Sequence, residues 1–201
     1  LKIPAGKNLP EGAAHILSSV SSFPSFLMVG TIEPRKSHMQ TLSSFEILWK
    51  SGLEVNLIIV GKKGWLAETI EDRIRNHPEF KKHLIWFEGI KDEYLDAIYA
   101  SSTCLLAVSE AEGFGLPIIE AAQHKLPVIA RDIPVFREVA GEYAYYFNNS
   151  TDPETLAGAV IEWIKLYDQG NHPKPDHMPR LTWDESASQL LNIITGPDAS
   201  V

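Results

Sequence analysis

Short apolar runs alternate along the chain with longer amphipathic segments. The apolar runs are rich in β-branched residues and leucine, which is typical of strands buried on both faces of a parallel sheet. Such strands are expected at residues 25–30, 55–61, 84–88, 103–108, 127–130 and 143–147. The other segments carry apolar residues at helical spacing, as in Leu42, Phe45, Leu48 and Trp49. Helices are therefore expected at residues 38–50, 66–76, 92–101, 117–124, 134–139, 153–167 and 183–194.

This alternation predicts the fold class. Strands that alternate with helices form parallel sheets through right-handed crossovers, and the helices cover both faces. We therefore expect an α/β protein with a Rossmann-like parallel sheet. The sheet domain is expected to cover residues 25–168, after an N-terminal linker segment at 1–24. Residues 169–201 are expected to form a proline-rich connection and a C-terminal helix.

Composition narrows the class of protein. A chain of 201 residues with 44% hydrophobic and 22% charged residues is ample for one globular domain. Its formal net charge of −8 disfavours a nucleic-acid partner, because such proteins concentrate Lys and Arg on the surface that binds phosphates. The single cysteine, Cys104, lies in an apolar run, where a buried hydrophobic role is expected. This usage fits a reducing, cytoplasmic setting.

The sequence carries no signal for a membrane span or for secretion. No apolar stretch approaches the ~18 residues that a spanning helix needs, and the first residues contain no signal-peptide core. The chain begins with Leu1 instead of Met, so a fragment of a longer protein is expected.

Polar residues collect in the segments that follow the predicted strands, where ligands of open parallel sheets bind. In SEAEGFGLPIIEAA, Glu112 precedes Gly113 and Gly115, and a helix is expected to begin at Pro117. The N-terminus of that helix would attract an anion, and glycine would let the backbone approach a ligand. Glu120 lies about one turn inside the helix, and its carboxylate suits the hydroxyls of ribose or of a sugar.

Taken alone, this segment has a simpler explanation as an ordinary helix start with a solvated Glu120, and for one short motif we favour it. The segment MVGTIEPRKSHMQ adds Arg35 and Lys36 directly after the first strand, where they could bind a diphosphate. Taken alone, these two residues are better explained as an exposed basic pair on a solvated loop. The coincidence favours a site, because the topology brings this loop and the Glu112 loop to one crevice.

These segments resemble landmarks of one family. EGFGLPIIE resembles the Glu-x7-Glu signature of the retaining family 4 glycosyltransferases, with Glu112 and Glu120 as its two acids. GTIEPRK is similar to the family's phosphate-binding segment, and LIIVGKKG, FEGIKDEYLDAIYASS and LPVIARDIPVFREVAGEYAYYF match further landmarks in the same order. The resemblance covers about residues 26–163. It implies the donor-binding, C-terminal lobe of a two-lobed GT-B enzyme, whose N-terminal lobe would bind the acceptor.

The resemblance also implies roles for single residues. Arg35 and Lys36 would bind the donor diphosphate and offset charge on the departing nucleotide, and Glu112 would contact hydroxyls of the donor sugar. Glu120 would bind the ribose, and Ile90 would lie beside the base through its main chain. The other implied donor-binding residues are Gly30, Thr31, Gly113, Phe114, Gly115 and Leu116.

The phosphate-binding segment departs from the family's pattern at one position. Many family members carry arginine directly after the glycine of the first segment, whereas this chain has Thr31, so Arg35 is expected to make that phosphate contact. The backbone amides of Gly115 and Leu116 would hold a phosphate or the sugar. No cofactor or metal ion is expected, because cations and helix ends take that role in such enzymes and the histidines here are scattered. Arg131 is expected to be structural.

The expected activity is retaining transfer of a hexose from a nucleoside-diphosphate sugar to a glycan or lipid-linked acceptor. The Glu-Pro-Arg-Lys variant favours GDP-mannose over a UDP-linked donor, and membrane association would belong to the rest of the enzyme. One alternative is a donor-binding module that is inactive by itself. A sugar-nucleotide epimerase is weaker, because epimerases generally lack Glu-x7-Glu. A dinucleotide-dependent dehydrogenase fits poorly, because no G-x-G-x-x-G follows the first strand.

Overall fold

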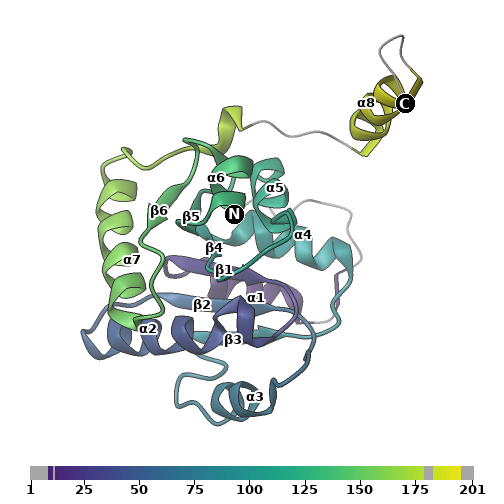
Figure 1. Cartoon of the computed structure of the whole chain (residues 1–201). Coiled ribbons are helices and arrows are strands. Elements are labelled where there is room, and N and C mark those ends of the chain that lie inside the picture. Colours follow the sequence, from purple (N-terminus) through teal and green to yellow (C-terminus); the bar gives the residue numbers. More distant parts are fainter. Residues whose placement is uncertain (1–8, 11, 179–182, 196–201) are drawn as a thin grey trace.

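The computed structural model describes residues 9–10, 12–178 and 183–195, and Figure 1 shows its helices and strands. In this described part, six parallel strands form one sheet in the order β3-β2-β1-β4-β5-β6. The strands are β1 (Ser25–Val29), β2 (Asn56–Val60), β3 (Leu84–Phe87), β4 (Cys104–Ala107), β5 (Val128–Arg131) and β6 (Tyr145–Phe147). Strand direction and order confirm the Rossmann-like α/β class.

Helices cover both faces of the sheet, which is why the strands are almost continuously apolar. The helices of one face are α1 (Ala13–Val20), α4 (Asp92–Ser101), α5 (Leu116–Gln123) and α6 (Pro134–Ala140). Those of the other face are α2 (His38–Lys50), α3 (Glu68–Arg75) and α7 (Pro153–Asp168). Successive strand residues point to opposite faces, so Leu27 packs in the first layer and Phe26 in the second, against Trp163 of α7.

The observed elements follow the predicted ones closely, with ends that differ by one or two residues. Helix α1 was not expected. Its Ala13, Leu17 and Val20 are buried against the sheet, within the segment that we expected to be a linker. Two short 3-10 helices were also not expected, η1 (Pro34–Lys36) and η2 (Pro175–His177). Helix α8 (Trp183–Thr195) agrees with the last predicted helix. The boundaries of the three predicted segments remain predictions.

The position of the site follows from the strand order. β1 pairs with β2 on one side and with β4 on the other. The chain leaves β1 toward α2 on one face of the sheet and leaves β4 toward α5 on the opposite face. Because the two connections diverge there, a crevice opens at the carboxyl ends of β1 and β4, where ligands of such sheets bind.

Candidate functional site

Two loops meet at this crevice, as the sequence predicted. The loop after β1 contains Arg35 and Lys36, and the loop after β4 contains Glu110 and Glu112. The backbone amide of Glu110 donates to the carbonyl of Arg35 at 2.9 Å, which fixes the two loops to each other. The segments that the sequence analysis singled out are therefore held in contact by main-chain atoms, independently of their charged side chains.

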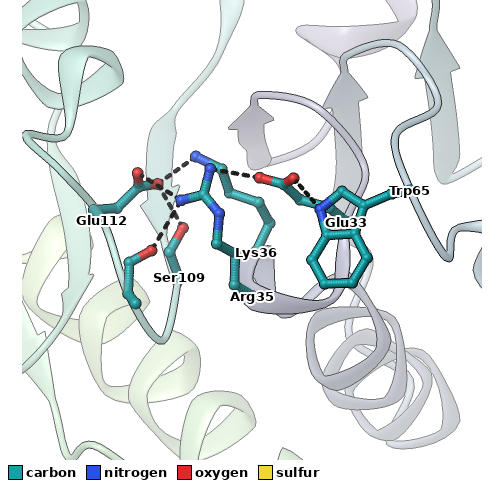
Figure 2. A network of polar contacts seen from close by, with 7 residues as sticks. Glu33, Arg35, Lys36, Trp65, Ser109 and Glu112 are labelled. Carbon is teal, nitrogen blue, oxygen red and sulfur yellow. Dashed lines mark hydrogen bonds and ion pairs between the residues drawn. The ribbon is translucent and has the colours of Figure 1, made fainter.

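Glu112 is the centre of a polar network, shown in Figure 2. Its carboxylate accepts from Arg35 Nη1 at 3.2 Å and from the Lys36 ammonium, and it also accepts from the Ser109 hydroxyl at 2.8 Å. Arg35 Nη1 also donates to the carbonyl of Ala111 at 3.1 Å. The Glu112 side chain is only 11% exposed. Because little water reaches this carboxylate, its interactions with the two cations are stronger than they would be in bulk water. The structure thus brings together Arg35, Lys36 and Glu112, to which the resemblance assigned contacts with the donor diphosphate and sugar.

The environment of Glu112 keeps it ionised. Burial by itself would raise the pKa of this carboxyl, but the hydrogen bonds from Lys36 and Ser109 and the charges of Lys36 and Arg35 outweigh burial and lower the pKa below its usual value. Around Glu112 the network consists of one carboxylate and two cations, while Arg35 also pairs with a second carboxylate, that of Glu33. Both cations therefore have carboxylate partners, which an anion that binds here has to replace.

Sequence reasoning missed three members of the network, which are Ser109, Glu33 and Trp65. Glu33 accepts from Arg35 Nη2 at 2.5 Å through one oxygen and from the indole of Trp65 at 2.8 Å through the other. Trp65 belongs to the loop after β2 and is 58% exposed, and Figure 2 shows it beside Glu33. Both residues stand in segments that follow strands, so their position was the available signal. The hydrogen bond between Trp65 and Glu33 could not be predicted from the sequence, because it depends on how the two loops approach each other.

Helix α5 begins at the same crevice. Gly115 precedes it with φ of 93°, in the left-handed region that favours glycine. A Cβ at this position would also lie 3.2 Å from the Phe136 ring. The helix begins at Leu116, one residue before the expected start, so Pro117 is its second residue. Among the described residues no side chain caps this end, so it keeps the partial positive charge of a helix N-terminus.

A cavity of about 20 Å³ lies between these elements. Lys36, Glu112 and Gly115 line it, together with the buried His38 and parts of β1 and β4. Glu120 and Ile90 do not line this cavity. Glu120 lies further along α5, where it accepts from the Tyr99 hydroxyl at 2.6 Å, and Ile90 is half-buried after β3. Their contacts to a donor therefore remain predictions.

The remaining donor-binding candidates differ in exposure. Thr31, Gly113, Phe114 and Leu116 are exposed, with Phe114 at 56% and Leu116 at 48%. Gly30 is half-buried, and its amide donates to the carbonyl of Val60, which ties the loop after β1 to β2. Exposed positions beside the cations leave the backbone of these segments open to a ligand. Their assigned roles in donor binding stay predictions.

Arg131 has the structural role that was expected. It is fully buried at the end of β5 and donates to the carbonyls of Val108 at 2.9 Å and Ser150 at 2.5 Å. Its second terminal nitrogen contacts the side chains of Gln40 and Ser37. Arg131 therefore ties α2, the end of β4 and the loop after β6 together beneath the charged network.

The described residues contain neither a cluster of metal ligands nor a membrane-spanning helix. No three His, Cys, Asp or Glu side chains within residues 12–178 or 183–195 gather in a way that could hold a metal ion. No helix in the same part of the chain is long and apolar enough to cross a membrane.

The fold and the site define a class of protein. A parallel sheet with this strand order, carrying cations and a helix N-terminus at its switch point, is typical of nucleotide-binding α/β proteins. A family model described as Glycosyl transferases group 1 matches residues 16–177. The chain belongs to this family of glycosyltransferases, which confirms the resemblance that the sequence motifs indicated.

Individual relatives agree with this result. The chain is 50% identical over 183 residues to the serotype-specific mannosyltransferase WbdA of Escherichia coli, a match that covers 91% of this chain and 22% of that protein. The chain thus spans about a fifth of the length of this relative. It is also similar, at 30% identity over 141 residues, to the O-antigen chain mannosyltransferase B of Escherichia coli, covering 69% of this chain and 36% of that protein.

Solved structures support the fold. The C-terminal domain of a glycosyl transferase group 1 family protein (LpcC) from Francisella tularensis matches with a TM-score of 0.67 at 16% identity, over 83% of this chain and 87% of that one. Anabaena Alr3699/HepE in complex with UDP and glucose matches with a TM-score of 0.65 at 15% identity, over 85% and 46%. The architecture is therefore that of a GT-B lobe.

Proposed function

We propose that this chain binds the nucleoside-diphosphate sugar donor of a hexosyltransferase, and that the donor is GDP-mannose. The proposal is carried by Arg35 and Lys36, which lie at the switch-point crevice beside the N-terminus of α5. Two cations and a helix N-terminus suit a diphosphate, whose charge they offset. Mannose is supported by the 50% identity to a protein described as a mannosyltransferase.

Donor binding changes the partners of the charged network. In this proposal the diphosphate takes over the Arg35 and Lys36 contacts, and Glu112 turns its carboxylate to hydroxyls of the donor sugar. Glu120 accepts from the ribose hydroxyls, and the main chain at Ile90 lies beside the base. In this exchange the two cations keep an anionic partner, because the diphosphate replaces Glu112, and the Glu112 carboxylate accepts hydrogen bonds from sugar hydroxyls instead.

The reaction then breaks the bond between the anomeric carbon and the diphosphate and forms a bond from that carbon to an acceptor hydroxyl oxygen, with retention of configuration. The proton of the acceptor hydroxyl passes to an oxygen of the departing diphosphate. Arg35 and Lys36 stabilise the negative charge that develops on the leaving diphosphate. No metal ion is proposed for this step. The acceptor, a glycan or a lipid-linked glycan of a cell-surface polysaccharide, binds to a part of the enzyme outside this chain.

Calorimetric titration with GDP, UDP, ADP and GDP-mannose tests the proposal. We expect GDP to bind more tightly than UDP or ADP, and Lys36→Ala to weaken GDP binding by at least about tenfold, because a charge-assisted contact is lost. Lys50→Ala is the matched control, since it removes the same charge at the opposite end of α2. Binding of none of these nucleotides, or equal binding by the Lys36 and Lys50 variants, would contradict the proposal.

The second candidate is a donor-binding module without activity of its own. It is favoured by the coverage of WbdA, of which this chain matches 22%. The two candidates share the donor site and differ in catalysis. Mannose transfer to a polysaccharide acceptor by the 201-residue chain alone would exclude the inactive module. Donor binding without transfer, followed by transfer when the remainder of the protein is supplied, would support it.

A further inference from the structure

Tyr99 and Glu120 form a hydrogen bond that the proposed function does not use. The Tyr99 hydroxyl on α4 donates to Glu120 Oε2 on α5 at 2.6 Å. Tyr99 is 2% exposed, whereas Glu120 is only half-buried. A buried donor on one helix thus fixes one oxygen of a carboxylate that remains partly open on the next helix.

The direction of this hydrogen bond is permanent. Burial, together with the charge of Glu120 and the hydrogen bond itself, raises the pKa of the Tyr99 hydroxyl well above its ordinary value. The phenol therefore stays protonated at any physiological pH and can only donate to the carboxylate. A carboxylate offers about four lone-pair positions, so Glu120 keeps several of them for a ligand after accepting from Tyr99.

The tyrosine ring is itself held in place. It stacks on His124, which directly follows α5, with ring centroids 5.1 Å apart and planes inclined by 2°. His124 Nε2 lies 3.3 Å from Asp96 Oδ1 on α4. Glu120 and His124 are one helical turn apart, so both face Tyr99 from the same side of α5. The ring cannot rotate away without breaking the stack, so the hydroxyl keeps a fixed position from which it donates to Glu120.

We infer that Tyr99 is a positioning residue that holds Glu120 ready for the ribose hydroxyls, so that this lobe selects ribonucleotides over nucleotides without those hydroxyls. The inference rests on the proposed function, in which Glu120 binds the ribose. A glutamate side chain that is already fixed loses little conformational freedom when a ligand arrives. An unfixed glutamate would lose that freedom on binding, and affinity for the ribose would fall.

Tyr99→Phe tests the inference, because it removes the hydroxyl and keeps the ring that stacks on His124. GDP and 2′,3′-dideoxy-GDP are titrated calorimetrically into the unsubstituted chain and into the variant. We expect Tyr99→Phe to weaken GDP binding by about tenfold, the size of one hydrogen bond to a charged group. Affinity for 2′,3′-dideoxy-GDP should change less than about twofold, because that ligand lacks the groups that Glu120 would contact.

Two further variants complete the experiment. Tyr145→Phe is the matched control, because Tyr145 donates to Glu162 at 2.8 Å at a different place on the domain and should leave both affinities unchanged. In a Glu120→Gln background, Tyr99→Phe should have almost no further effect on GDP, since the carboxylate that it positions is gone.

The outcomes distinguish failure of the positioning role of Tyr99 from failure of the proposed donor-binding function. If the unsubstituted chain binds GDP and Tyr99→Phe binds both ligands like the unsubstituted chain, the positioning role is wrong and the proposed function stands. An equal loss for GDP and the dideoxy ligand would show a merely structural role for Tyr99 and would also overturn the inference. If the unsubstituted chain binds no nucleotide, the proposed function fails and the inference fails with it.

Discussion

Lys36 and Glu112 form an ion pair across the crevice, although 76 positions separate them in the sequence. The pair joins the loop after β1 to the loop after β4, and Arg35 shares the same carboxylate. In the structure Glu112 therefore occupies the cations that the proposed diphosphate would need. Removing the negative charge of Glu112 should therefore strengthen nucleotide binding at this crevice.

Glu112→Gln should strengthen binding of GDP to this chain. The substitution removes a negative charge beside the proposed diphosphate site while keeping the shape of the side chain. Two unit charges 4 Å apart interact by about 1 kcal/mol in water and by more when partly buried, so we expect affinity to rise about fivefold. Calorimetry with GDP measures the change, and Glu142→Gln, at an exposed position in a different loop, controls for net charge. Unchanged or weaker binding in the Glu112 variant would refute the competition.

Arg131→Met should destabilise the fold strongly. The buried guanidinium donates to Val108 and Ser150, and its loss leaves these carbonyls without their donor. We expect the free energy of unfolding to fall by about 3 kcal/mol. Urea unfolding followed by circular dichroism measures this. Arg137→Met is the comparison, because Arg137 makes an exposed pair with Asp132 and should matter far less. Similar losses in the two variants would show that burial of Arg131 is not decisive.

Burial of His38 should make stability depend on pH. Burial, opposed by a hydrogen bond with the Glu33 backbone and helped by the charge of Lys36, lowers the pKa of His38 to about 4. The unfolded chain therefore binds more protons between about pH 4 and pH 6.5, so stability falls as the pH drops through this window. At pH 5 the neutral form costs the fold about 2 kcal/mol relative to pH 7 or above.

His38→Gln isolates this effect from the other titrating groups. Urea unfolding at pH 7 and pH 5 gives the loss of stability on acidification for the chain and for the variant. We expect the variant to lose about 2 kcal/mol less than the unsubstituted chain between these pH values. The same acid dependence in both proteins would mean that His38 is not the titrating group.

Gly115→Ala should destabilise the start of α5. Gly115 has φ of 93°, and an added Cβ would lie 3.2 Å from Phe136. We expect a loss of about 1–3 kcal/mol in the free energy of unfolding, and weaker GDP binding because the helix N-terminus shifts. Gly113→Ala is matched to it, since a Cβ there would meet no atom within 4 Å. If thermal unfolding shifts equally for both variants, backbone conformation at Gly115 is not what matters.

The course of the chain was largely predictable from sequence, and the exception is instructive. Buried strands and amphipathic helices have distinct apolar periods, so the strands and most helices were located to within one or two residues at their ends. Helix α1 was missed, although Ala13, Leu17 and Val20 have helical spacing. The segment is short and rich in serine, so only its burial against the sheet distinguishes it from a linker.

Candidate residues were also visible in the sequence, because ligands of parallel sheets bind where strands end and few segments meet that condition. Arg35, Lys36, Glu112 and Glu120 all come from such segments or from the helix that follows one. The family resemblance then assigned their roles. Short-range order and residue chemistry were enough for this step.

The partners of these residues were decided only by the tertiary structure. The contact of Lys36 with Glu112 and the hydrogen bond from Tyr99 to Glu120 join helices and loops that are distant in sequence. Periodicity shows which face of an element is buried, but it carries no information on which side chain of another element lies opposite. That choice depends on strand order and on the packing of the two helix layers, so the sequence by itself determined the fold class and the candidate residues, and the folded sheet determined how they pair.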